Sequence, residues 1–260
     1  MNPRPKSPKY PQTPTQLLTS LRTWNATSPR LSWYGPDSER VEFSGRVLDN
    51  WVAKTANYLV DELDAEPGTV ICLDLPLHWR TFVWLLATWA VGATAVSASD
   101  QLAGSPSATA ADIVATTDPV GTQELLAAAK PAPLIVAVAL PALQMRWLGE
   151  LPARTLDYSG DVRAHADEFF ADDSPAPNDV AWRHNSAATS YEQLLAPEAE
   201  PAPETQAPSP QRVLLEVRAG WEAVVPAALK VWAEGGSVVL LDAGVEPTDH
   251  LRASEQITRG

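Results

Sequence analysis

The hydrophobic residues follow two patterns, which alternate along the chain. Residues 70–75 and 134–139 are nearly continuous apolar runs, as is typical of parallel strands covered on both faces. After Ser44, which offers an N-cap, apolar residues recur at helical spacing as far as Leu63. Residues 81–98 predict a buried helix followed by a short buried strand. This alternation predicts an α/β fold, with a mainly parallel sheet and flanking helices.

Weaker patterns continue the series on both sides of this region. The additional strands that we expect are at 31–34, 40–43, 112–116, 155–158, 180–182, 213–217 and 238–241. The additional helices that we expect are at 123–129, 162–170 and 221–233, with a short helical piece that ends near Leu195. Gly235 and Gly236 predict a turn between the last helix and the last strand.

Composition divides the chain into four parts. Residues 1–15 are basic and proline-rich without an apolar core, and we expect a disordered tail rather than a secretory signal. We expect residues 16–195 to form the α/β domain. Residues 196–210 contain five prolines, three glutamates and no basic residue, which predicts a flexible linker. Residues 211–260 are a βαβ-like segment that completes or flanks the same fold.

The charge balance limits the classes of partner. The chain of 260 residues has a net charge of −13, so we expect neither nucleic acid nor a membrane surface as a partner. Residues 81–98 carry no charge, but their threonines and Gly92 favour a buried helix and strand over a membrane span. The single cysteine, Cys72, excludes an internal disulfide. We expect a cytoplasmic protein.

Motifs that carry chemistry are absent from the sequence. There is no GxGxxG, Walker loop, HExxH or GxSxG, and the four histidines are far apart in the sequence. Cys72 stands in the middle of an apolar strand, where a thiol is usually inert. We therefore predict no catalytic residue, no metal ligand and no cofactor.

The weak candidates for ligand binding follow the ends of predicted strands, where open α/β sheets form their ligand crevices. They are His78, Trp79, Arg80, Asp100 and Arg183. Arg80 could pair with an acyl or aromatic carboxylate, or it could simply face solvent near a helix start. Trp79 could line a pocket or pack in the core.

Residues 31–100 resemble the opening of the adenylate-forming superfamily, which includes acyl-CoA synthetases and peptide-synthetase adenylation domains. The resemblance is carried by a hairpin with VEFSGRVLDNWVAKTANYLVDEL, then by EPGTVICLDLP and HWRTFVWLLATWAVGATAVSASD. Residues 111–116 and 211–242 also look like segments of this family. The chain looks most similar to a small actinobacterial family of truncated, uncharacterised relatives. The resemblance implies the fold of the N-terminal part of these enzymes.

The departures from the family pattern shape the functional expectation. The resemblance implies that active members carry a Ser/Thr/Gly-rich loop after a segment like 180–182. This loop ends in a lysine and grips the ATP phosphates. Here the sequence reads RHNSAATSYEQLL, with neither glycine nor lysine. No residue matches the family's adenine, ribose, magnesium or lid motifs, so no ATP-binding or catalytic position is carried over.

Two functional hypotheses follow. The first is a non-catalytic binding or interaction module, whose partner is another protein, a second copy of the chain or a small carboxylate. The alternative is an ATP-dependent, carboxylate-adenylating enzyme with an atypical nucleotide site. An unrelated α/β enzyme is a third, more distant reading.

Overall fold

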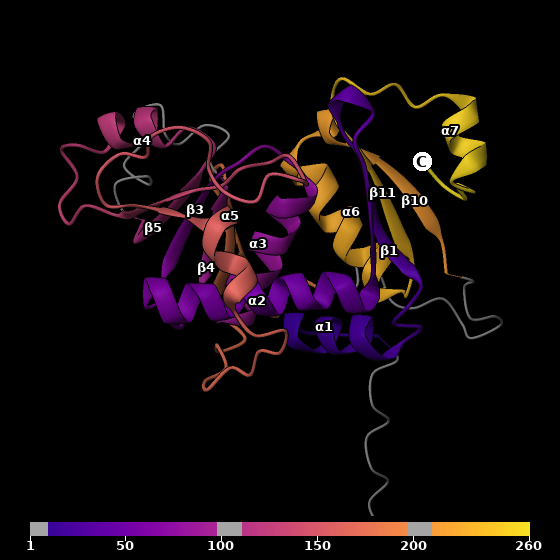
Figure 1. Cartoon of the computed structure of the whole chain (residues 1–260). Helices are drawn as coiled ribbons and strands as arrows, with labels where there is room; N and C mark the ends of the chain where they lie inside the picture. The colour runs from indigo at the N-terminus through magenta and orange to yellow at the C-terminus, as the bar shows by residue number, and fades with distance from the viewer. Residues whose placement is uncertain (1–9, 98–110, 197–209) are drawn as a thin grey trace, which may run out of the picture.

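The computed structural model describes residues 10–97, 111–196 and 210–260, and their strands form two sheets (Figure 1). The larger sheet has seven strands in the order β7-β6-β5-β3-β4-β8-β9. Its strands are β3 (Val70–Asp74), β4 (Thr94–Ser97), β5 (Ile113–Thr116), β6 (Leu134–Ala137), β7 (Thr155–Asp157), β8 (Val180–His184) and β9 (Ala187–Ser190). Every neighbouring pair is parallel except β8 and β9. This confirms the predicted α/β fold with a mainly parallel sheet.

The smaller sheet joins the two ends of the chain. Its order is β10-β11-β1-β2, from β1 (Pro29–Tyr34), β2 (Arg40–Ser44), β10 (Arg212–Glu216) and β11 (Ser237–Leu241). Strand β1 pairs in parallel with β11 and antiparallel with β2. The segment after residue 210 therefore pairs with the N-terminal hairpin and does not extend the seven-stranded sheet.

Four helices lie between or beside the two sheets: α1 (Pro14–Thr23), α2 (Gly45–Leu63), α3 (Trp79–Ala90) and α6 (Trp221–Ala233) (Figure 1). Helix α3 contacts β1 in one sheet and β3 and β4 in the other. All twelve of its residues are buried, as expected for a helix enclosed by two sheets. The shorter helices are α4 (Pro119–Leu125), α5 (Tyr158–Asp161) and α7 (Asp249–Ser254), with 3₁₀ turns at Pro36–Ser38, Val162–Ala164 and Val217–Ala219.

Both faces of the central strands are covered, which explains their continuous apolar sequences. Ile71 and Leu73 on β3 face the main core, and Cys72 between them packs in a second cluster with Val114 and Leu126. The smaller sheet repeats this pattern, because alternate residues of β11 pack under α6 and against a third cluster that includes Leu251 of α7. Each sheet is therefore packed on two sides.

Local capping explains most of the helix boundaries. The Ser44 side chain accepts a hydrogen bond from the Val47 amide at 3.3 Å, as the sequence predicts. Thr13 caps α1 in the same way and Pro14 occupies its first turn, so this helix begins inside the segment expected to be a tail. Asp118 caps α4, which starts four residues before the expected helix. Asp157 caps α5.

Two expectations about the segment after Tyr158 are wrong. The helix ends in a 3₁₀ turn at Val162–Ala164, and Phe170 lies outside it with 77% of its surface exposed. Between β8 and Leu195, a strand (β9) and turns replace the expected short helical piece, because the chain reverses at Asn185 and pairs with β8. Asn185 has a φ of 51°, a left-handed conformation that asparagine tolerates better than most residues.

Some expectations fall outside the described residues. These are Asp100, residues 1–9 of the expected tail and residues 197–209 of the expected linker. Across the part of the chain that the structure describes, no helix combines the length and apolar character needed to cross a membrane.

Candidate functional site

Arg80 is completely buried at the start of α3, so the expectation that it faces solvent is wrong. Its Nε donates to the carbonyl oxygen of Leu140 at 3.2 Å and its Nη2 to that of Pro141 at 3.3 Å. The guanidinium carbon lies 4.3 Å from the centroid of the Trp79 ring, within cation–π range. The polypeptide that leaves β6 thus closes over this side chain.

Within the described ranges, the buried charge of Arg80 has no carboxylate partner. Among the residues that the structure describes, none forms an ion pair with it, and its Nη1 has no hydrogen-bond acceptor. Burial lowers the pKa of Arg80 to about 10, so the group is still protonated at neutral pH. An unpaired buried cation is costly, and it attracts any anion that reaches it.

His78 and Trp79 are buried beside Arg80. The Trp33 and His78 rings have centroids 4.5 Å apart, and Phe43 and Trp79 are 4.8 Å apart. Burial, with the Arg80 charge adding to it, lowers the pKa of His78 to about 3. The neutral imidazole accepts a hydrogen bond from the Arg80 amide at 3.2 Å and caps α3. In this structure Trp79 packs in the core and His78 acts as a helix cap.

Arg183 lies elsewhere, as an exposed residue on β8, which β4 separates from β3 in the sheet. Its neighbour His184 is buried, with Nδ1 2.5 Å from Oγ of Ser97. The Nε2 of His184 lies 3.7 Å from Oε1 of Glu222. Hydroxyl, imidazole and carboxylate are the components of a hydrolytic triad, but Ser97 is only 1% exposed and cannot reach a substrate in this conformation.

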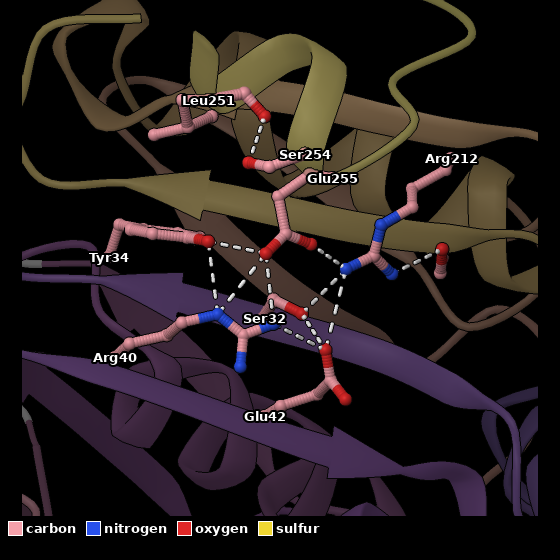
Figure 2. Close-up of polar contacts among 9 residues, drawn as sticks. Ser32, Tyr34, Arg40, Glu42, Arg212, Leu251, Ser254 and Glu255 are labelled. Carbon is pink, nitrogen blue, oxygen red and sulfur yellow. Dashed lines mark hydrogen bonds and ion pairs between the residues drawn. The ribbon is translucent and has the colours of Figure 1, made fainter.

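A second polar region, which the sequence patterns did not reveal, covers part of the outer face of the four-stranded sheet. Figure 2 shows its centre, Glu255, which directly follows α7. The Glu255 carboxylate accepts hydrogen bonds from the Tyr34 hydroxyl, from Arg212 and from Nη2 of Arg40, the last at 2.8 Å. We call Ser32, Tyr34, Arg40, Glu42, Arg212, Ser237 and Glu255 the sheet-face network.

The other members complete this network. Oε2 of Glu42 accepts from Nη2 of Arg40 at 2.8 Å and from Oγ of Ser32 at 3.0 Å, and Arg212 donates to Ser237 at 3.1 Å. Burial alone raises the pKa of Glu255, but the hydrogen bonds from Tyr34, Arg212 and Arg40 outweigh it and lower the value to about 2. Glu255 is therefore an anion at every physiological pH.

The network borders an open groove of about 460 Å³. Its walls come from five segments: the loop between α1 and β1, strand β2, the start of β10, the turn between α6 and β11, and the end of α7. The Gly235-Gly236 turn, predicted from the sequence, forms one wall. Gly236 has no room for a side chain, because a Cβ there would lie 2.5 Å from the carbonyl oxygen of Gln211.

One sequence signal could have indicated this surface. Ser32 and Tyr34, and likewise Arg40 and Glu42, are two residues apart on strands, so each pair lies on one face of the sheet. What the pattern could not supply is the strand order that places Arg212 beside them.

As for metals, no three His, Cys, Asp or Glu side chains in the described ranges are arranged to hold an ion.

A sequence comparison finds a relative that this chain matches over nearly the whole of both sequences. A TIGR03089 family protein of Mycobacterium tuberculosis is 32% identical over 255 residues, which cover 95% of this chain and 98% of that protein. No protein-family model matches the chain.

The solved structures with the same fold include acyl-CoA synthetases and related ligases. An acyl-CoA synthetase of Brucella canis has a TM-score of 0.66 at 15% identity, over 93% of this chain and 46% of that protein. Acetoacetyl-CoA synthetase from Streptomyces lividans has a TM-score of 0.67 at 18% identity, over 92% and 40%. The anthranilate CoA ligase AuaEII, in complex with anthranoyl-AMP, has a TM-score of 0.66 at 14% identity, over 96% and 48%.

The chain thus spans about half the length of these solved structures or less. At such low identity the likeness concerns the fold. The relative of matching length is what assigns the family. This protein belongs to the TIGR03089 family, and its fold matches the N-terminal part of the adenylate-forming acyl-CoA synthetases.

Proposed function

We propose that this protein is a non-catalytic member of the acyl-CoA synthetase-like fold that acts as a binding or interaction module. The observation that carries the proposal is the hairpin of β8 and β9. Its turn and second strand follow residues 180–182 in the sequence, where the family resemblance implies the phosphate-gripping loop. Its residues 185–190 read NSAATS, without glycine or lysine.

The contacts of this hairpin leave little to hold a triphosphate. Residues Ala187–Ser190 pair with β8 in an antiparallel ladder, and Nδ2 of the Asn185 side chain donates to Oε1 of Glu222 at 2.7 Å. His184 is buried against Ser97, which leaves Arg183 as the one cationic side chain in the hairpin. Adenylation develops charge on the phosphates and needs preorganised cations and N–H groups around them. A carboxylate such as Glu222 beside the turn opposes that charge.

Adenylation is tested directly by turnover. The purified full chain is incubated with ATP, Mg²⁺ and a panel of carboxylic acids, and pyrophosphate and acyl-adenylate are measured beside an acyl-CoA synthetase as the positive control. We expect no product above the blank without protein. Acid-dependent pyrophosphate release would contradict the proposal and favour the adenylating enzyme with an atypical nucleotide site.

Any turnover that appears must be assigned to this chain. An Arg183→Gln variant removes the exposed cation of the hairpin, and Arg146→Gln removes an exposed arginine in the loop after β6 as a matched control. Loss of product in the first variant alone would locate the activity in the hairpin and overturn the proposal. Equal product in wild type and both variants would place the activity outside the hairpin, and it would also contradict the proposal.

A further inference from the structure

We propose that the groove beside the sheet-face network is a binding site for a small molecule with a single carboxylate, which Arg40 and Arg212 hold. This assigns a ligand class and a place to the binding module proposed above, and it rests on that proposal. The carboxylate considered from the sequence was assigned to Arg80, whereas this site lies on the opposite, outer face of the smaller sheet.

The groove has the dimensions of a small-molecule site. Its volume of about 460 Å³ lies within the range of roughly 300–1,000 Å³ in which such ligands bind. Because its walls come from five segments that are distant in the sequence, the folded chain preforms it. Both Arg40 and Arg212 line it, together with amide side chains such as Gln211 and Gln256 that can bind the polar remainder of a ligand.

The lining carries one positive charge more than it carries negative charges. Arg40 and Arg212 are paired with Glu42 and Glu255. The third arginine, Arg30, has no carboxylate partner among the described residues and donates instead to the carbonyl oxygens of Trp24, Gly235 and Gly236. In a chain with a net charge of −13, this local excess marks the groove as a place that attracts one negative charge.

Two guanidinium groups have N–H donors left for a ligand. In the described part of the chain no acceptor contacts Nη1 of Arg40 or Nε of Arg212, although the remaining nitrogens of both groups are hydrogen-bonded within the network. The Arg40 side chain is 43% exposed and that of Arg212 is 16% exposed. Charge-assisted hydrogen bonds from arginine to a carboxylate are among the strongest polar contacts in proteins.

The network also fixes both arginines before a ligand arrives. Glu255, which is 7% exposed, accepts from both guanidinium groups and holds them on one side of the groove. Side chains that are already ordered lose little conformational entropy on binding. Glu42 and Glu255 set a limit as well, because one negative charge neutralises the single excess positive charge of the lining, and the second charge of a phosphate dianion would remain uncompensated beside these carboxylates.

The test measures binding to the full chain without ATP. Butyrate and benzoate are titrated calorimetrically, with butyramide and benzamide as neutral ligands of the same shape and inorganic phosphate as the competing anion. We expect saturable binding of at least one carboxylate, no binding of its amide, and weaker binding of phosphate. Stronger binding of phosphate, equal binding of acid and amide, or no binding of either acid would overturn the inference.

Variants locate the site. Arg40→Gln removes the more exposed guanidinium and should weaken carboxylate binding about tenfold, as expected for loss of one charge-assisted contact. Arg218→Gln is the matched control, because Arg218 is a similarly exposed arginine that pairs with Glu216 outside the groove. Far- and near-ultraviolet circular dichroism confirms that both variants are folded. Equal weakening by both variants, or none by Arg40→Gln, would contradict the assignment to the groove.

Failure here is distinct from failure of the proposed function. Acid-dependent adenylate formation would refute the non-catalytic proposal whatever the groove binds. If no product forms in the adenylation assay and no carboxylate binds in the titration, only the assignment of the groove is refuted.

Discussion

The carboxylate of Glu255 lies 2.8 Å from Nη2 of Arg40, 215 residues away in the sequence. Glu255 directly follows α7 and Arg40 begins β2, so this contact joins the end of the chain to the N-terminal hairpin. Because the same carboxylate also accepts from Arg212 on β10, it connects three elements of one sheet face (Figure 2). Apolar contacts of Leu251 add to this connection.

Acid should weaken this connection. The pKa of Glu255 is lowered in the folded state to about 2, against an ordinary value of 4.5. A lowered folded-state pKa stabilises the fold above the unfolded-state value, and the stabilisation is lost as pH falls from about 5 toward 2. We expect the loss to be about 2–3 kcal/mol of the free energy of unfolding, measured by urea denaturation across this pH range.

Glu255→Gln is the control for the acid effect. Burial raises the pKa of Asp49 and Asp161, so these groups contribute with the opposite sign. Their contribution is common to the wild type and the variant and cancels in the difference. Glutamine does not titrate and carries no charge, so the variant should be less stable than the wild type at pH 7. This difference in the free energy of unfolding should become smaller at low pH, where Glu255 of the wild type is protonated too. If the difference in the free energy of unfolding between the wild type and Glu255→Gln is the same at every pH, the titration of Glu255 is not the source of the acid effect.

Substitutions at Arg80 should distinguish volume from charge. Arg80→Ala removes a buried side chain packed on Trp79 and should destabilise the fold by about 3 kcal/mol. Arg80→Met fills most of the same volume and removes the cost of an unpaired buried charge. This variant should therefore lose about 1 kcal/mol or less of the free energy of unfolding. Urea denaturation of both variants measures the difference. An equally large loss for methionine and alanine would show that the charge and its hydrogen bonds, and not the volume, hold this region together.

Cys72 should be unreactive in the folded protein. Burial, with a contribution from Asp74, raises the pKa of its thiol to about 12, and the side chain is fully buried in the second core cluster. Since the thiolate is the reactive form, a disulfide reagent should react with the native chain only at the rate of unfolding. In denaturant it should titrate one thiol per chain. Rapid reaction of the native protein would show that β3 opens locally.

The parts of the fold that the sequence predicted are those whose patterns are local. Strand β3, helix α6 and the Ser44 cap follow from apolar periodicity and capping residues within a few positions of one another. Helix α1 was missed, although Thr13 and Pro14 are a start signal, because its proline-rich surroundings favour a tail. Helix α7, with six residues, is too short to show a period.

The groove could not be predicted for a different reason. It depends on β1 lying between β2 and β11, a pairing between opposite ends of the chain that no local pattern specifies. Arg80 illustrates the converse error. A charged residue at a helix start favours solvent exposure by its type, and only the loop with Leu140 and Pro141 encloses it.

The binding of MgATP tests the central claim most directly. The full chain is titrated with MgATP by calorimetry and by thermal shift, beside an acyl-CoA synthetase as the positive control. With no lysine or glycine in the β8–β9 hairpin, we predict neither saturable heat nor a rise in melting temperature. Saturable binding of MgATP that is lost in Arg183→Gln and kept in Arg146→Gln would show that this hairpin does hold a triphosphate, and it would contradict the account.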